Sequence, residues 1–266
     1  MKKSLKALLL ATIVGSLLVG CGGKDNAADK ALNTLEKVKA EKKIKIGLED
    51  TYPPMEFRDE ANKLVGFDID LADAIGKKLG VQTEYVITEF GGLTMALNAG
   101  KFDMSLSAIS VNEERAKQVD FSEAYVKGGQ AIVVKSDNGS ITKVEDLTGK
   151  TIGAQLGTTG EEAAKKIAGV KEVKTYDKAT QPFHDLEIGR IDAVVVDEFV
   201  GRYYLAKQEG KFKVAVTLDE EPIAIAFKKG DKEIQEAVKK AIEELKNDGT
   251  MSELSIKWFG EDIYKK

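Results

Sequence analysis

The chain has 266 residues, and its 40 Lys and Arg against 44 Asp and Glu give a formal net charge of −4. This length allows one or two domains with a sizeable core, and the acidic balance argues against a nucleic-acid partner. One Cys and one His exclude a disulfide framework and a zinc site of the usual Cys/His kind, so we expect no cofactor and no metal.

The first 20 residues are predicted to be a secretory signal peptide. Three lysines open the chain, and the mostly apolar run Ala7–Val19 is too short to span a bilayer. Without residues 1–20, 37 basic and 44 acidic residues leave a net charge of −7. The run ends Leu18-Val19-Gly20-Cys21, which resembles the bacterial lipobox, and this resemblance implies that Cys21 becomes the mature N-terminus and carries a lipid. A plain signal peptide, or a buried free Cys, is the alternative.

The segment 21–41 is predicted to be a tether. Its residues are small, charged and polar, although Ala31–Ala40 has some helical spacing. A domain anchored by lipid needs such slack to work away from the membrane.

The next part of the chain is predicted to alternate strands and helices. Lys43–Gly47 alternates basic and apolar residues, as a strand does. The loop after it, which contains Pro53 and Pro54, presents Glu49 and Tyr52 at the carboxyl end of that strand. The further elements predicted here are a helix from Gly66 to Gly80, a strand over 81–87, a helix from the glycines after Phe90 to about Asn98, and a strand over 102–106.

The loop Ser105–Arg115 follows the third strand and carries the strongest chemical signal. The hydroxyls of Ser107 and Ser110, free backbone N–H groups at a helix start and the Arg115 guanidinium are the groups that bind a small carboxylate. We therefore predict that this loop holds the α-carboxylate of an amino acid. The alternative is that Arg115, which follows two glutamates, is only a surface salt-bridge partner.

The second half of the chain repeats this order of elements. An apolar strand over 151–154 leads into the polar loop Gln155–Gly160 and a helix over 161–168, and another strand over 191–196 ends at Asp197. The remaining elements predicted are a strand over 131–135 that leaves the first part, a helical turn over 144–147, a strand over 223–227 that returns to it, and helices over 231–246 and 252–258.

A short internal echo supports two similar lobes. Leu97–Asp103 and Leu186–Asp192 both have the pattern Leu-x-x-Gly-basic-apolar-Asp, and both lie between a helix and an apolar strand. We expect the two aspartates to be structural.

Several motifs then follow one another in a specific order. They are Gly47-x-Glu49-x-x-Tyr52-x-Pro54, Gly66-Phe-Asp-Ile-Asp70-Leu, Gly100-Lys-x-Asp103, the Ser107–Arg115 loop, Asp120-Phe-Ser122, Gly157-Thr-Thr159, Gly189-Arg-x-Asp192 with Asp197, and Asp248-Gly-Thr250 with Lys257-Trp-Phe259. From about Ile44 onward, this set resembles the polar amino-acid-binding proteins of bacterial ABC importers, the family 3 solute-binding lipoproteins.

The resemblance implies an α/β fold of the type II periplasmic-binding-protein kind, with two lobes, two hinge strands and a ligand cleft between the lobes. On this basis residues 42–129 and 226–266 form lobe 1, and residues 130–225 form lobe 2. We expect a monomer that binds a free amino acid, is anchored to the membrane outside the cytoplasm by its lipid, and docks on ABC permease subunits.

The resemblance also assigns ligand-binding roles. Arg115 would bind the α-carboxylate, Asp197 would take the α-ammonium, and Glu49 would face the ligand side chain. Ala108 stands where a serine is often found. The full set of implied ligand-binding residues is Glu49, Tyr52, Phe90, Ser107, Ala108, Ser110, Arg115, Thr158, Thr159 and Asp197, with Gln155 as a further candidate.

The identity of the ligand stays open at this point. An acid at Glu49 favours a basic amino acid of the arginine or lysine type, whereas cystine or another polar amino acid is the alternative. A cyclohexadienyl-dehydratase-like enzyme on the same scaffold is a second alternative, in which Glu49 would be the general acid. The common catalytic motifs, such as G-x-S-x-G and H-E-x-x-H, do not occur, so we expect a binding protein rather than an enzyme.

Overall fold

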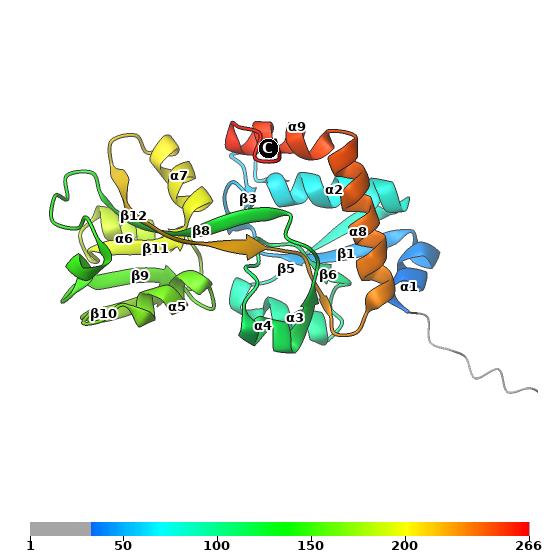
Figure 1. The fold of residues 1–266 in the computed structure, drawn as a ribbon, viewed down its shortest axis with the longest axis horizontal. Coiled ribbons are helices and arrows are strands. Elements are labelled where there is room, and N and C mark those ends of the chain that lie inside the picture. The colour runs from blue at the N-terminus through cyan, green and yellow to red at the C-terminus, as the bar shows by residue number, and fades with distance from the viewer. Residues whose placement is uncertain (1–32, 266) are drawn as a thin grey trace, which may run out of the picture. The chain divides into compact units, whose positions relative to one another are not determined.

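Two separate five-stranded β-sheets organise the chain, which a computed structural model describes over residues 33–265 (Figure 1). The first sheet has the strand order β5-β1-β6-β13-β7, and the second has the order β10-β9-β11-β8-β12. The predicted α/β class is thereby confirmed. The predicted signal peptide, Cys21 and most of the predicted tether lie outside the described residues. Of the helices in the described part, none has the length and apolar character needed to cross a membrane.

The first sheet forms the centre of lobe 1. Strand β1 (Lys43–Leu48) pairs in parallel with β5 (Gln82–Ile87) and β6 (Met104–Ser105). Ile44, Ile46 and Leu48 are fully buried on β1, as the alternating sequence predicts. Strand β13 (Ala226–Lys228) completes the sheet and is antiparallel to both β6 and β7 (Val119–Phe121). A small separate sheet consists of β2 (Thr51–Tyr52), β3 (Glu56–Arg58) and β4 (Leu64–Val65).

The helices of lobe 1 follow the predicted apolar spacing. In α8 (Lys232–Asn247), the stripe Ile234, Val238, Ala241, Ile242 and Leu245 is buried. Helix α2 (Phe67–Leu79) begins directly after Gly66, and its C-cap is Gly80, whose φ of 72° is the left-handed conformation that glycine favours. Lobe 1 also contains the 3₁₀ turn η1 (Phe90–Gly92), α3 (Leu93–Asn98), α4 (Glu113–Gln118) and α9 (Thr250–Phe259).

The prediction of a tether is wrong for its last eight residues. Thr34–Glu41 forms helix α1, which is started by a capping box between Asn33 and Glu36. Val38 is fully buried, and Lys37 Nζ lies 3.1 Å from Asp103 Oδ1. The buried Val38 and the capping box stabilise a helix here, although the polar composition of the segment suggested a flexible linker.

The second sheet forms the centre of lobe 2. Strands β9 (Thr151–Gln155), β10 (Glu172–Tyr176) and β11 (Ala193–Asp197) are parallel, and β8 (Val126–Lys135) is antiparallel to β11. Strand β10, helix α7 and most of β12 were not predicted, since their apolar spacing is weak. The helices of this lobe are the turn η2 (Val144–Leu147), α5 (Thr159–Lys166), α6 (Gln181–Glu187) and α7 (Glu198–Lys207).

The two aspartates of the internal echo have equivalent roles in the two lobes. Asp103 Oδ2 accepts the backbone N–H of Lys45 on β1 at 2.8 Å. Asp192 Oδ2 accepts the backbone N–H of Thr151, which begins β9, also at 2.8 Å. Each carboxylate therefore ties a strand start to the turn after a helix, and the prediction that they are structural is confirmed.

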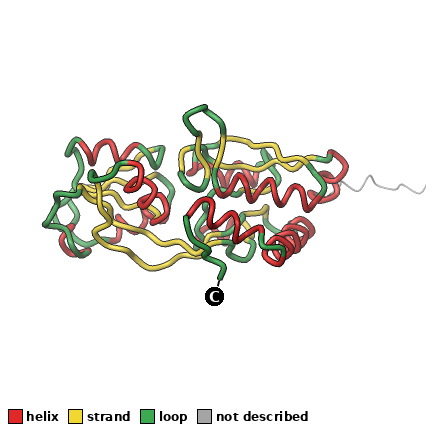
Figure 2. Tube along the Cα trace, turned by 90° about the horizontal axis from the view of Figure 1, so that it is seen from above, coloured by secondary structure: helices red, strands yellow, loops and turns green. Residues whose placement is uncertain are grey.

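Two long antiparallel strands, β8 and β12 (Phe212–Ile223), connect the lobes, and they lie side by side in both views (Figures 1 and 2). The strand predicted over 223–227 is in fact interrupted: β12 ends at Ile223, and β13 begins at Ala226 in the other sheet. The predicted lobe boundaries, at 129/130 and 225/226, fall inside β8 and between β12 and β13. Beside this crossing, the backbone of Val111 donates to the Pro222 carbonyl at 2.8 Å, so β12 is tied to the loop of Ser110.

We predict that Gly47→Ala destabilises the protein by about 1–3 kcal/mol through overpacking. A Cβ at Gly47 would lie 2.2 Å from the ring of Phe102, which is itself buried. Urea unfolding of the variant measures the change. Gly139→Ala is the matched control, because a Cβ there meets nothing within 4 Å, and its effect should stay within about 0.5 kcal/mol. Equal stability of the two variants would contradict the packing argument.

Candidate functional site

The predicted site residues stand at strand ends of both sheets, and direct contacts join them. Glu49 follows β1, and Gln155 ends β9 in the other lobe; Gln155 Nε2 donates to Glu49 Oε2 at 2.7 Å. A second contact joins the Arg115 guanidinium of lobe 1 to the Gly157 carbonyl of lobe 2 at 2.8 Å. We name this meeting place of the two lobes the inter-lobe site. Carboxyl ends of parallel strands are where open α/β sheets bind ligands.

Arg115 is held in place by neutral groups. Its two terminal nitrogens donate to the carbonyls of Ser110 and Gly157, and the guanidinium lies 5.3 Å from the centre of the Phe90 ring. Among the described residues, Arg115 forms no ion pair. Burial lowers the pKa of Arg115, while the nearby acids Glu162 and Glu221 act against this shift. The alternative that Arg115 is a surface salt-bridge partner is therefore wrong, and the guanidinium is suited to receive an anion.

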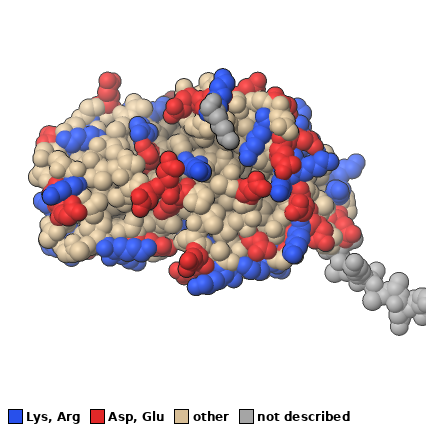
Figure 3. Space-filling view, in the orientation of Figure 1, with Lys and Arg blue, Asp and Glu red and all other residues tan. Residues whose placement is uncertain are grey.

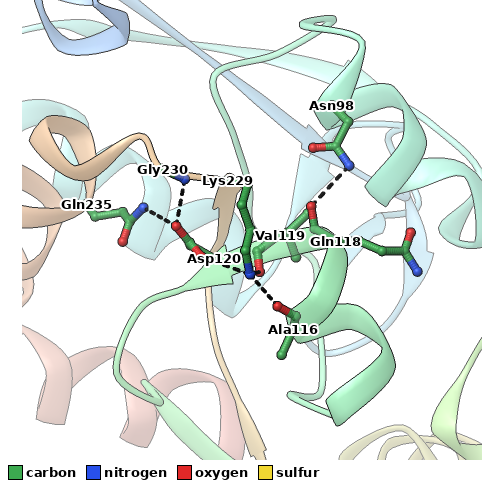
Figure 4. Close-up of polar contacts among 8 residues, drawn as sticks. All are labelled: Asn98, Ala116, Gln118, Val119, Asp120, Lys229, Gly230 and Gln235. Carbon is green, nitrogen blue, oxygen red and sulfur yellow. Dashed lines mark hydrogen bonds and ion pairs between the residues drawn. The ribbon is translucent and has the colours of Figure 1, made fainter.

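Helix α4, which carries Arg115, is fixed at both ends. At its start, the side chain of Asn112 accepts the Arg115 backbone N–H at 2.8 Å. At its end, Lys229 Nζ donates to the carbonyl of Ala116 and lies 3.3 Å from Asp120 Oδ1 (Figure 4). A lysine at the last carbonyls of a helix complements its dipole. The C-terminal segment of lobe 1 thus positions the helix of the candidate clamp.

The loop before α4 uses several of its polar groups for its own structure. The Ser107 hydroxyl accepts the backbone N–H of Glu49 at 3.1 Å and donates to Glu56 Oε1 at 2.7 Å. The backbone N–H of Ala108 donates to Asp68 Oδ2 at 2.8 Å. The N–H of Ala108 is thus already engaged by a buried acid in this structure.

Glu49 is a nearly fully buried acid with one unpaired oxygen. Its side chain is 2% exposed; Oε2 accepts from Gln155, and Oε1 has no partner among the described residues. Burial raises the pKa of Glu49 to about 7, although the bond from Gln155 acts in the opposite direction. Gln155, which sequence reasoning treated only as a candidate, is thus a direct neighbour of Glu49.

Asp197 is the corresponding buried acid of lobe 2. It ends β11 and caps helix α7, since its Oδ1 accepts the backbone N–H of Phe199 at 2.9 Å. Burial raises the pKa of Asp197 to about 7, and the charge of Glu221 adds to the shift. Tyr52 lies near this acid: burial raises the pKa of its hydroxyl well above the usual range, and Asp197 and Glu49 contribute. Tyr52 therefore stays a neutral donor.

The two threonines at the start of α5 have different tasks. Thr158 is the N-cap: its hydroxyl accepts the Glu161 backbone N–H at 3.1 Å and donates to the Gln155 carbonyl at 2.7 Å. Thr159 donates to Glu221 Oε2 at 2.6 Å, and its hydroxyl lies 3.3 Å from that of Ser110 in the other lobe. The structure therefore brings Thr159 into the inter-lobe site, whereas the hydroxyl of Thr158 is committed to helix α5.

Sequence reasoning missed Glu221. It stands on β12 opposite Gly128 of β8, where the two strands cross between the lobes, and it acts on both Arg115 and Asp197. Glu221 belongs to the acidic run Asp219–Glu221, which has the composition of a solvent-exposed strand edge, so nothing in the sequence indicated a role in the site. Gln130 was missed as well; its amide donates to the Thr159 hydroxyl at 3.1 Å.

Charge is mixed on the face of the protein that Figure 3 shows. Basic and acidic side chains alternate there over most of the described surface, without one continuous basic stripe on this face.

Comparison with known proteins gives consistent matches. A family model described as bacterial extracellular solute-binding proteins, family 3, matches residues 44–261. The L-cystine-binding protein TcyJ of Escherichia coli K12 is 34% identical, over 97% of this chain and 96% of that protein. A solved ancestral arginine-binding protein bound to arginine is 47% identical, with a TM-score of 0.79, over 82% of this chain and 98% of that one. A third, the ancestral amino acid-binding protein AncCDT-1, described as a precursor of cyclohexadienyl dehydratase, is 37% identical with a TM-score of 0.80, over 86% of this chain and all of that one.

We predict that Glu49→Gln stabilises the ligand-free protein at pH 8 by about 1–3 kcal/mol, but not at pH 4. The folded pKa of Glu49 is raised to about 7, so the stability contributed by its neutral form is present at low pH. That contribution is lost as the pH rises from the unfolded pKa through the folded one. A glutamine keeps the bond from Gln155 and never ionises. Urea unfolding at the two pH values measures the difference.

The exposed Glu253→Gln is the control for this prediction and should change little at either pH. A Glu49→Gln variant that is less stable than the wild type at pH 8 would contradict the strain assigned to the buried charge.

Proposed function

The chain belongs to the bacterial extracellular solute-binding proteins of family 3, and we propose that it captures a basic amino acid, of the arginine or lysine type, for an ABC importer. Its named relatives include a cystine-binding protein, an extracellular arginine-binding protein and a putative amino-acid ABC transporter-binding protein. The finer assignment to a cationic side chain rests on the chemistry of the inter-lobe site.

Glu49 is the observation that carries this assignment. It is a buried acid with a free oxygen and a raised pKa, so its charge lacks a counter-ion. A guanidinium or ammonium at this position would complete the missing pair, and a buried pair with good geometry is far better than a lone buried charge. The neighbouring amide of Gln155 keeps the acid oriented from the opposite lobe.

Arg115 and Asp197 are proposed to bind the groups that all amino acids share. The guanidinium would take the α-carboxylate, aided by Ser110 and Thr159, and Asp197 would take the α-ammonium. Because the two charged groups belong to different lobes, one zwitterion would contact both and favour the closed arrangement. Strands β8 and β12 would be the hinge of this movement.

Cystine is the main alternative ligand. A cystine-binding relative is 34% identical and an arginine-binding relative, ArtP of Bacillus subtilis, is 33% identical, so relationship alone does not separate the two ligands. The second ammonium group of cystine could also pair with Glu49. We favour the basic amino acid because Glu49, a buried acid without an ion pair in the described chain, matches one cationic side chain.

An enzyme is the less favoured alternative. The neighbour described as a dehydratase precursor is itself an amino acid-binding protein. A prephenate-like substrate carries carboxylates and no ammonium group, so it would face the buried Asp197 unfavourably. We therefore propose a monomeric binding protein, anchored to the membrane through a lipid on Cys21, rather than a catalyst.

We predict that Arg115→Ala weakens amino-acid binding by about 2–5 kcal/mol, because it leaves a buried ligand carboxylate without its partner. Isothermal titration with arginine measures the affinity, and circular dichroism checks the fold. Arg190→Ala is the control, since Arg190 pairs with Asp185 on the surface of lobe 2 and should leave affinity unchanged. If a folded Arg115→Ala protein keeps the wild-type affinity for arginine, the proposed binding of the α-carboxylate by Arg115 is wrong.

We predict that the affinity for arginine rises with pH more steeply than the affinity for citrulline, its uncharged analogue. Both ligands need Asp197 ionised, but only arginine also needs Glu49 ionised, and the pKa of each acid is raised to about 7. Below pH 7 the arginine-to-citrulline affinity ratio should rise by up to about tenfold per pH unit and then level off. Titration from pH 5 to pH 8.5 measures it.

Glu49→Gln should abolish this difference in pH dependence while leaving citrulline binding nearly unchanged. A ratio that stays flat with pH in the wild type, or tight binding of cystine with none of arginine, would overturn the assignment to a basic side chain.

A further inference from the structure

Two carboxyl side chains that the proposed function does not use lie beneath the binding loop. Glu56 belongs to β3, and Asp68 lies in the first turn of α2; both are 0% exposed. The two carboxyl groups are electrostatically coupled, since the charge of Asp68 raises the pKa of Glu56. Buried acids of this kind need an explanation, since an isolated buried carboxylate is strongly unfavourable.

The two acids hold successive residues of the loop. Glu56 Oε1 accepts the Ser107 hydroxyl at 2.7 Å, and Asp68 Oδ2 accepts the Ala108 backbone N–H at 2.8 Å. Ala108 has a φ of 44°, in the left-handed region that an alanine rarely adopts. The bond to Asp68 therefore fixes the loop at the point where its backbone is strained.

No cation balances the pair within the described chain. Neither acid takes part in an ion pair with lysine, arginine or histidine. The titratable groups that face the two acids are instead Tyr125, whose hydroxyl donates to Asp68 at 2.9 Å, Tyr264 behind it, and Tyr52 and Glu49 on the side of the inter-lobe site. The surroundings are thus neutral or acidic, and two negative charges here would repel each other without compensation.

The unpaired oxygens show how the pair is satisfied. Neither Glu56 Oε2 nor Asp68 Oδ1 has a hydrogen-bond partner among the described residues. A single proton between them would satisfy both atoms and leave one negative charge. Asp68 suits the charged form, because two donors point at its other oxygen and it lies at the positive end of α2. Glu56 suits the neutral form, and burial together with the charge of Asp68 raises its pKa.

We propose that Glu56 and Asp68 share one proton and that this pair positions the loop 107–110 for the ligand. The proposal rests on amino-acid binding by the loop, but not on which amino acid binds. Glu56 and Asp68 are positioning residues, because they act through Ser107 and Ala108 and do not touch the ligand.

Glu56→Gln and Glu56→Ala form the first test. The amide of glutamine can donate to Asp68 and accept from Ser107, so it replaces the shared proton, whereas alanine does neither. We expect the dissociation constant for arginine at pH 7 to stay within about threefold of the wild type in Glu56→Gln, and to rise at least tenfold in Glu56→Ala. Should Glu56→Ala not fold, Ser107→Ala breaks the same contact from the other side and should also weaken binding at least tenfold.

The second test is the pH dependence of unfolding from pH 5 to pH 9. Because the pKa of Glu56 is raised in the folded protein, the stability that its neutral form contributes is lost as the pH rises from the unfolded pKa through the folded one. The glutamine variant has no proton to lose. The ratio of the wild-type unfolding constant to that of Glu56→Gln should therefore rise by up to about tenfold per pH unit. Glu123→Gln, at an exposed acid paired with Lys239, should follow the wild type throughout.

Parallel pH dependence of Glu56→Gln and the wild type would overturn the shared proton. A folded Glu56→Gln protein that binds as weakly as Glu56→Ala would overturn it too, because an ionised Glu56 would then be required. If the wild type binds none of the amino acids tested, the proposed function fails, while the unfolding measurement still decides the state of the pair.

Discussion

Two buried acids, Glu49 and Asp197, and the half-buried guanidinium of Arg115 lie where the lobes meet, and none of the three forms an ion pair within the described residues. Arg115 is bonded to carbonyls, and Glu49 and Asp197 are held by an amide and a backbone N–H. Taking charges out of water is costly unless an opposite charge compensates. Such a site is therefore strained when it is empty and relieved by a small molecule whose charges are arranged in the complementary order. The stability lost in this way is what gives the ligand its binding energy.

The two lobes divide this task. Lobe 1 supplies the guanidinium on a short helix that is capped at both ends, together with Glu49 at the end of β1. Lobe 2 supplies Asp197 and the start of α5, where Thr159 reaches toward Ser110. The same β8–β12 ladder that joins the sheets also carries Glu221 into the site. If β8 and β12 are the proposed hinge, Glu221 connects the hinge to the charge balance of the site.

The sequence predicted what depends on local periodicity and missed what depends on tertiary neighbours. The buried stripe of α8, the glycine that ends α2 and the alternation of β1 follow from spacing alone. Strand β10 and most of β12 have weak patterns, because their burial comes from the sheet around them. Arg115 was recognisable because its loop combines hydroxyls with a helix start. The contact between the Ala108 N–H and Asp68 was not, since it joins residues 40 positions apart in the chain. In the sequence, Glu56 and Glu221 resemble ordinary surface acids. Burial distinguishes Glu56, and the contact with Thr159 distinguishes Glu221.

The strained backbone of Ala108 connects the buried acid Asp68 to the proposed binding loop. A left-handed alanine persists only where its surroundings determine it, and here they are a buried carboxylate, a tyrosine hydroxyl and the start of α2. Because these groups are fixed before any ligand arrives, the loop does not have to be ordered by the ligand, and less conformational entropy is lost on binding. In the proposed mechanism, the movement between the lobes is then the main change that accompanies capture, while the loop of the proposed carboxylate clamp stays fixed. Such a clamp would separate recognition of the groups that all amino acids share from the proposed selection of the side chain by Glu49.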